Sequence, residues 1–135
     1  MNFVLDTHVW ISIFSNQQFE KNLIRLTDNR LRIYSFSEQL KEFADVHNKH
    51  PKISKMLPLK TQDYVNALRL TSFQIETVKN YRLLNDYKDN YRVDLSNVTK
   101  STLVSNDKGF GILKKLHSTE IRVISIVDFY EYIGL

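Results

Sequence analysis

The sequence predicts an α/β protein in which helices cover both faces of a central, mainly parallel sheet of four to five strands. Short apolar runs alternate with longer stretches whose apolar residues recur at helical spacing, which is the order of elements expected for a parallel sheet. Most of these runs are mainly apolar, as in strands that are buried on both faces. Only 3 Gly and 2 Pro interrupt the 135 residues, so we expect one domain over residues 1–135.

Five segments have the composition of strands, and they lie at 3–5, 31–34, 73–77, 102–104 and 122–126, the third being the weakest. Helical spacing predicts helices at 19–26, 36–47, 61–70, 90–99, 109–116 and 127–133. Ser35 and Glu38 match a capping box, which fixes a helix start near Phe36. Pro51 and Pro58 are expected to break helices in the segment 48–60, which forms either a mobile arm or an ordinary solvated connection.

Composition excludes several classes of function. The chain carries 19 Lys or Arg and 15 Asp or Glu, a net charge of +4, and no Cys. The missing thiols exclude zinc ribbons, thiol catalysis, iron–sulfur clusters and disulfide-rich secreted scaffolds. No export signal is visible and no apolar run approaches the roughly 18 residues that span a membrane, so we expect a cytoplasmic protein without a membrane partner. The modest positive charge permits a polyanionic partner without requiring one.

Two aspartates stand at the ends of predicted strands. Asp6 directly follows the run 3–5, and Asp107 follows the run 102–104 after a two-residue interval. The carboxyl ends of parallel strands form one edge of a sheet, and α/β proteins bind their ligands in the crevice beyond that edge. We therefore expect Asp6 and Asp107 to lie on the same edge.

Two helices bring further acids toward this edge. Glu42 lies one turn beyond Glu38, and capping explains Glu38 but not Glu42. Asp89 stands at the start of the helix 90–99, and Asp94 lies further along it. Each acid also has a plain structural explanation, because Asp6 and Asp89 suit helix N-caps, Glu42 suits a solvated helix surface and Asp107 suits a turn.

Taken together, the acids favour a metal site. Carboxylates that are brought close together repel one another, and their pKa values rise unless a cation neutralises them. Mg²⁺ or Mn²⁺ suits a site with oxygen ligands only. The chemistry that this arrangement favours is metal-assisted hydrolysis of a phosphodiester.

The same residues resemble the PIN-domain family. The strand that ends in Asp6-Thr7-His8 resembles the start of PIN domains, and residues 34–43 resemble the serine-initiated helix that bears their metal-binding glutamate, a role that falls on Glu42. Residues 50–53 resemble a basic, proline-bearing stretch of the VapC-like branch, the toxin components of toxin–antitoxin systems. Residues 87–95, 103–110 and 123–130 are similar to the third acidic motif, the last acidic motif and the terminal strand and helix. The resemblance thus spans nearly the whole chain in the family's order.

This resemblance implies a PIN-like three-layer α/β/α fold and an endoribonuclease that depends on Mg²⁺ or Mn²⁺. It implies that the catalytic, metal-holding residues are Asp6, Glu42, Asp89 and Asp107, and that Ser105 and Asp94 support them. It also implies an RNA substrate and a cognate antitoxin protein as partners, and it allows a homodimer.

The chain departs from the family's pattern at four positions. His8 replaces the more frequent Asn, Ser105 stands for Thr, and Asn106 stands for Gly. Gly109 stands where a second Asp is common, which leaves open whether one or two ions bind. All of the principal acids are nevertheless present.

An RNA substrate requires cations near the acids. The candidates for phosphate contacts are Lys88, Arg92, Lys108, Lys52 and Lys55. The alternative function is a catalytically silent PIN-fold module that binds RNA or a protein partner. Such a module would retain RNA in the presence of a chelator, whereas the nuclease would need its metal.

Overall fold

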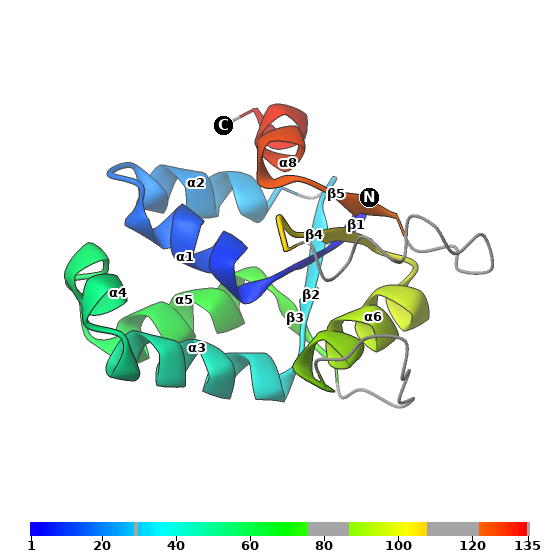
Figure 1. Cartoon of the computed structure of the whole chain (residues 1–135). Coiled ribbons are helices and arrows are strands. Elements are labelled where there is room, and N and C mark those ends of the chain that lie inside the picture. The colour runs from blue at the N-terminus through cyan, green and yellow to red at the C-terminus, as the bar shows by residue number, and fades with distance from the viewer. Residues whose placement is uncertain (29, 76–86, 108–121, 135) are drawn as a thin grey trace.

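The computed structural model describes residues 1–28, 30–75, 87–107 and 122–134, and within 87–99 it describes the backbone but not the side chains of 87–91 and 94. Its strands are β1 (Asn2–Leu5), β2 (Arg32–Ser35), β3 (Phe73–Gln74), β4 (Thr102–Val104) and β5 (Val123–Ile124). They form one parallel sheet in the order β3-β2-β1-β4-β5, with β1 in the middle (Figure 1). The predicted parallel sheet is therefore confirmed, including its weakest strand.

The helices are α1 (Thr7–Ser15), α2 (Phe19–Leu26), α3 (Ser37–Lys49), α4 (Pro51–Met56), α5 (Thr61–Thr71), α6 (Tyr87–Thr99) and α8 (Ile126–Ile133). Five of the predicted helices are confirmed as α2, α3, α5, α6 and α8. The helix predicted at 109–116 lies outside the described residues. No helix in the described ranges combines the length and the apolar character needed to cross a membrane.

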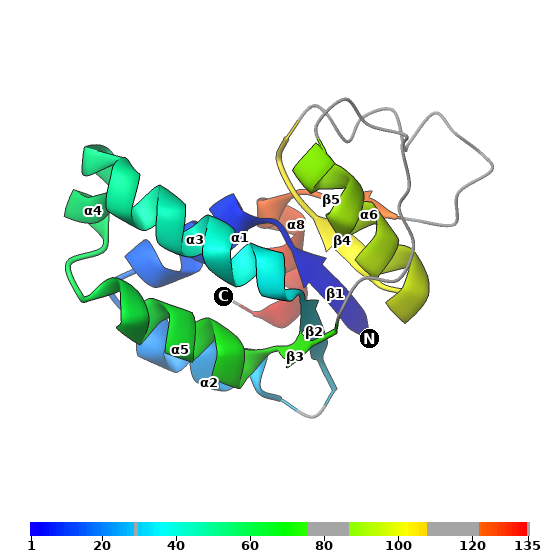
Figure 2. The same ribbon diagram turned by 90° about the horizontal axis from the view of Figure 1, so that it is seen from below.

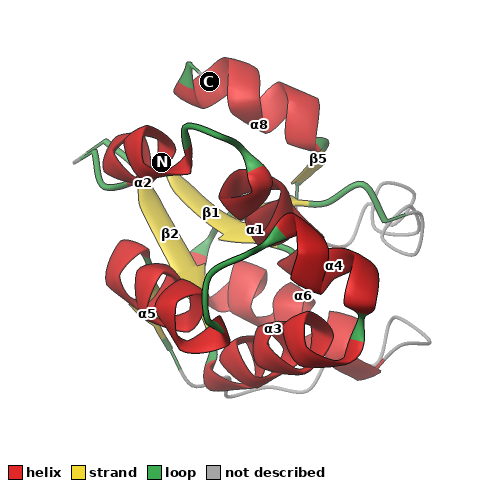
Figure 3. Cartoon of the chain, turned by 90° about the vertical axis from the view of Figure 1, so that its left-hand side faces the viewer, coloured by secondary structure: helices red, strands yellow, loops and turns green. Residues whose placement is uncertain are grey.

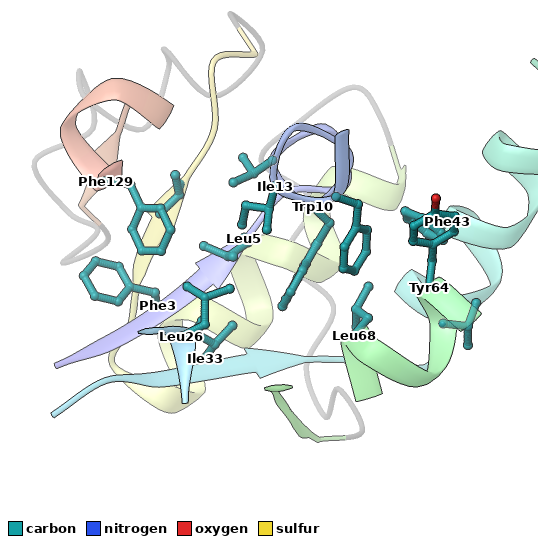
Figure 4. Close-up of a cluster of buried hydrophobic side chains, with 14 of the residues drawn as sticks. Phe3, Leu5, Trp10, Ile13, Leu26, Ile33, Phe43, Tyr64, Leu68 and Phe129 are labelled. Carbon is teal, nitrogen blue, oxygen red and sulfur yellow. The ribbon is translucent and has the colours of Figure 1, made fainter. Parts of the chain in front are cut away.

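Side chains alternate between the two faces of the central strand β1. Phe3 and Leu5 belong to a large buried cluster that they share with α1, α2, α3, α5 and α8 (Figure 4). Val4 points the other way and packs with Val93 and Leu95 of α6. Figure 2 shows α6 on one side of the sheet and α3 and α5 on the other, and Figure 3 shows β1 and β2 running between helices. The chain thus has three layers, as predicted.

Helix α1 was not among the predicted helices. Its residues 9–14 are almost continuously apolar, so no period distinguishes a helix from a strand there. The structure explains this composition, because Val9, Trp10, Ile13 and Phe14 are all buried. Burying Trp10 and Phe14 within one aromatic stack anchors α1 over the sheet.

The predicted break at Pro51 is confirmed, because α3 ends at Lys49 and α4 begins at Pro51, whereas the predicted capping box is wrong. Pro51 occupies the first position of α4, where the N–H that proline lacks has no helical partner to lose. The hydroxyl of Ser35 lies 2.7 Å from the hydroxyl of Ser72 instead of capping α3. Phe36 is the N-cap of α3 without a side-chain hydrogen bond, although the helix begins within one residue of its predicted start.

Candidate active site

Asp6 lies at the carboxyl edge of the sheet between two neighbouring strands. Leu5 of β1 is in register with Val104 of β4, and the backbone N–H of Asp6 donates to the carbonyl of Val104 at 3.0 Å. The Asp6 side chain begins α1, with Oδ1 accepting a hydrogen bond from the N–H of Thr7 at 2.8 Å. Asp6 is therefore both the N-cap of α1 and a carboxylate at the edge of the sheet.

Every oxygen of the Asp6 carboxylate has partners. Oδ2 accepts a hydrogen bond from the hydroxyl of Ser105 at 2.8 Å and lies 3.2 Å from Nδ1 of His8. Oδ1 lies 2.7 Å from Nε of Arg92. Burial acts to raise the pKa of Asp6, but the hydrogen bond from His8, the charges of Arg92 and His8 and the hydrogen bond from Ser105 together hold that pKa below its ordinary value. Asp6 is therefore an anion at neutral pH.

Glu42 reaches the same place from α3. Both of its carboxylate oxygens lie 2.6 Å from Nη2 of Arg92, and its side chain is 18% exposed. Gln39, one turn earlier, donates from Nε2 to the carbonyl of Leu5 at 2.5 Å, which ties α3 to the strand that ends at Asp6. The expected approach of Glu42 to this edge is therefore seen, whereas Glu38 is exposed and contacts Ser37.

Arg92 of α6 connects the two acids. Its side chain is 2% exposed, and Nη2 also donates to the hydroxyl of Thr7 at 3.0 Å. The expectation that Arg92 meets RNA phosphates at the surface does not fit this burial, because its guanidinium is enclosed by Asp6, Glu42 and Thr7. Residues 92, 95 and 96 of α6 are all buried, and this i, i+3, i+4 spacing places Arg92 on the inner face of its helix.

The loop after β4 completes the edge. The hydroxyl of Ser105 accepts a hydrogen bond from the N–H of Asp107 at 3.0 Å while it donates to Asp6. The N–H of Asn106 donates to Nε2 of His8 at 3.1 Å, while Nδ1 of the same ring faces Asp6. Asp107 is exposed two residues beyond Ser105, on the same edge as Asp6, as expected.

Of the remaining predicted site residues, some have side chains that the structure does not describe, and two lie on α4. Asp89 belongs to the first turn of α6, one turn before Arg92, and Asp94 and Lys88 belong to the same helix, but their side chains are not described. Lys108 lies outside the described residues. Lys52 and Lys55 are exposed on α4, which follows the C-terminal end of α3 (Figure 1).

The donor set has the chemistry of a site for a hard divalent ion. The carboxylate oxygens of Asp6 and Glu42 both contact the guanidinium of Arg92. Carboxylate oxygens are also the ligands that Mg²⁺ and Mn²⁺ prefer. Among the side chains that the structure describes, however, no group of three or more His, Asp or Glu converges as a metal site. Of the acids predicted to hold an ion, Asp6 and Glu42 contact the same guanidinium, and Asp107 is exposed on the same edge.

The chain is an α/β protein with a parallel sheet and with carboxylates at the carboxyl edge of that sheet, the edge at which proteins of this class bind their ligands. Among solved structures, the chain is similar to a chain in the crystal structure of VapBC2 from Rickettsia felis bound to a DNA fragment from their promoter, with a TM-score of 0.62 and 16% sequence identity over 93% of this chain and 98% of that chain. No family model and no curated protein matches the sequence. The structural likeness confirms the PIN-like fold that the sequence motifs predict.

Proposed function

We propose that this chain is a ribonuclease that hydrolyses phosphodiester bonds with the help of Mg²⁺ or Mn²⁺. The observation that carries this proposal is that the Asp6 and Glu42 carboxylates converge on one positive charge, the guanidinium of Arg92, at the carboxyl edge of the sheet. The PIN-like fold and the motif order of the sequence support the same chemistry. A divalent ion bound at such acids supplies a Lewis acid for the phosphodiester and a more acidic water at neutral pH.

The residues of the chain prepare this site in defined ways. Ser105 and the N–H of Thr7 fix the plane of the Asp6 carboxylate by donating to its two different oxygens. Gln39 holds the end of β1 against α3, so Glu42 and Asp6 stay at a fixed separation. In the proposed reaction Asp6, Glu42, Asp89 and Asp107 hold the ion, and Ser105 and Asp94 are supporting residues. Lys52, Lys55, Lys88 and Lys108 are the proposed contacts for RNA phosphates.

Cleavage of a mixed RNA pool tests the proposal. We expect the purified chain to cleave RNA with Mg²⁺ or Mn²⁺, and we expect a chelator or the Asp6→Asn substitution to stop cleavage. Glu42→Gln and Glu38→Gln form a matched pair on one helix, of which only Glu42→Gln should lose activity. Cleavage that survives chelation and Asp6→Asn would contradict the proposal.

The resemblance to VapC-like proteins supports a biological role as the toxin of a toxin–antitoxin module, with a cognate antitoxin protein as partner. Expression of the chain should then arrest growth, and co-expression of the product of an adjacent small open reading frame should relieve the arrest. Asp6→Asn serves as the control, because it should not arrest growth. Light scattering of the purified chain tests the proposed homodimer.

One observation favours a second candidate, a silent PIN-fold module that binds RNA or protein. Arg92 already compensates the acids without any ion. A silent module retains RNA equally with and without chelator and leaves it intact. The RNA cleavage experiment with the chelated control distinguishes these two functions.

A further inference from the structure

The guanidinium of Arg92 uses the carboxylate oxygens that a metal ion would need. Nε lies 2.7 Å from Oδ1 of Asp6, and Nη2 lies 2.6 Å from each oxygen of Glu42. Oδ2 of Asp6 is already engaged by Ser105 and His8. The Asp6 carboxylate is thus surrounded by Thr7, Ser105, His8 and the charged guanidinium of Arg92.

A divalent ion and this guanidinium therefore exclude one another. Mg²⁺ binds carboxylate oxygens directly at about 2.0–2.1 Å. An ion at that distance from both Oδ1 of Asp6 and an oxygen of Glu42 would share its space with nitrogen atoms 2.6–2.7 Å from the same oxygens. Two cations in such contact repel strongly in a poorly solvated site.

Arg92 also cannot vacate the site by losing its proton. Arginine stays protonated in proteins, so its charge remains wherever the side chain lies. A buried cation needs paired partners, and here Asp6, Glu42 and Thr7 provide them. The ion can enter only if the guanidinium moves away from these oxygens.

We propose that Arg92 is an internal counter-ion that competes with the divalent ion for Asp6 and Glu42 and thereby sets the metal affinity of the site. This inference rests on the proposed function in taking these two acids as ligands of the ion. Metal loading is then coupled to displacement of one buried side chain of α6. The chain holds its own acidic site closed until the concentration of the ion is high enough to replace the arginine.

Titration with Mn²⁺, followed by electron paramagnetic resonance, measures metal affinity without RNA or turnover. Arg92→Gln removes the charge and leaves a shorter polar side chain, and we expect it to bind Mn²⁺ at least tenfold more tightly than the unchanged chain. Arg69→Gln on the exposed face of α5 is the matched control and should leave the affinity unchanged. Equal affinities of the Arg92→Gln variant and the unchanged chain would overturn the inference.

A second measurement needs no variant, which matters because Arg92 is buried. In the unchanged chain, NMR of the arginine Nε–H groups during a Mg²⁺ titration should show the Arg92 signal shifting and exchanging faster with water as the ion binds. Mg²⁺ binding that leaves this signal unchanged would overturn the inference even if RNA is cleaved. Absent RNA cleavage together with tighter Mn²⁺ binding by Arg92→Gln would instead overturn the proposed function and leave the competition standing.

Discussion

The hydroxyl of Ser105 donates a hydrogen bond to Oδ2 of Asp6 at 2.8 Å and joins the ends of two neighbouring parallel strands. The same hydroxyl accepts from the N–H of Asp107 at 3.0 Å, so one side chain orients two of the proposed acids. The oxygen of Ser105 therefore links the shape of the loop after β4 to the orientation and ionisation of Asp6.

Replacing Ser105 by Ala should raise the pKa of Asp6, because a hydrogen bond to its charged form is lost. A hydrogen bond to a charged group contributes about 1.5–3 kcal/mol, and we expect the free energy of unfolding to fall by a similar amount. Carboxyl NMR titration and urea unfolding measure the two effects. Ser105→Thr keeps the hydroxyl and should behave like the unchanged chain; equal losses in both variants would contradict this explanation.

The stability of the chain should depend on the ionisation of Asp6. The pKa of Asp6 in the folded state lies below its ordinary value of 3.8, so the unfolded state binds the proton more readily. The stabilising contribution is therefore complete above the unfolded value and is lost as pH falls through the folded value. Urea unfolding between neutral and acidic pH should show a smaller acid-induced loss in Asp6→Asn than in the unchanged chain. Parallel pH profiles would argue against the charged pairing of Asp6.

Glu42 and Glu38 should differ in stability as well as in activity. Glu42→Gln takes a charged partner from the buried Arg92, and we expect it to lower the free energy of unfolding by about 2 kcal/mol. Glu38 is exposed, so Glu38→Gln should change stability by less than about 0.5 kcal/mol. Urea unfolding of the two variants checks this difference, and similar values for both would show that the contact with Arg92 contributes little.

Lys52 and Lys55 test the contribution of α4 to RNA binding. Both are exposed, and replacing both by Gln in the inactive Asp6→Asn background should weaken RNA retention. For single-stranded RNA, each lost phosphate contact reduces the slope of log affinity against log salt by about 0.7, so the double variant should lose about 1.4. Filter binding over a salt series measures the slope. Lys21→Gln on the exposed surface of α2 is the control; an unchanged slope in the double variant would remove α4 from the RNA-binding surface.

The sheet was predictable from sequence because each strand is a short apolar run, and so was the edge position of Asp6 and Asp107, which follow two of these runs. The approach of Glu42 to this edge was predictable because helix capping explains Glu38 but not Glu42. Helix α1 was not predicted because Ile11, which is only half-buried, extends the apolar run and hides the helical period. The capping box at Ser35 was predicted from a local pattern, but the Ser35 hydroxyl pairs with Ser72 instead. Ser72 is distant in sequence, so only the tertiary structure reveals this partner.

The role of Arg92 depends on residues far away in the chain. Its partners Thr7 and Glu42 are separated from it by 85 and 50 positions, and no local pattern records such pairing. A basic residue beside acidic motifs predicts a surface contact with phosphate more often than a buried ion pair. Only the packing of α6 against β1 distinguishes these two interpretations.

The central position of β1 has a consequence for synthesis of the chain. Strand β1 pairs with β2, which follows it closely in the sequence, but its other edge pairs with β4, whose residues follow β1 by about 100 positions. At about 5–20 residues per second, that edge stays without its native neighbour for roughly 5–20 s. Asp6 meets Arg92 and Ser105 only after this interval. A nascent chain thus contains Asp6 and Glu42 well before their partner Arg92 has been synthesised. During this time a chaperone or a misplaced strand would compete with β4 for the exposed edge of β1.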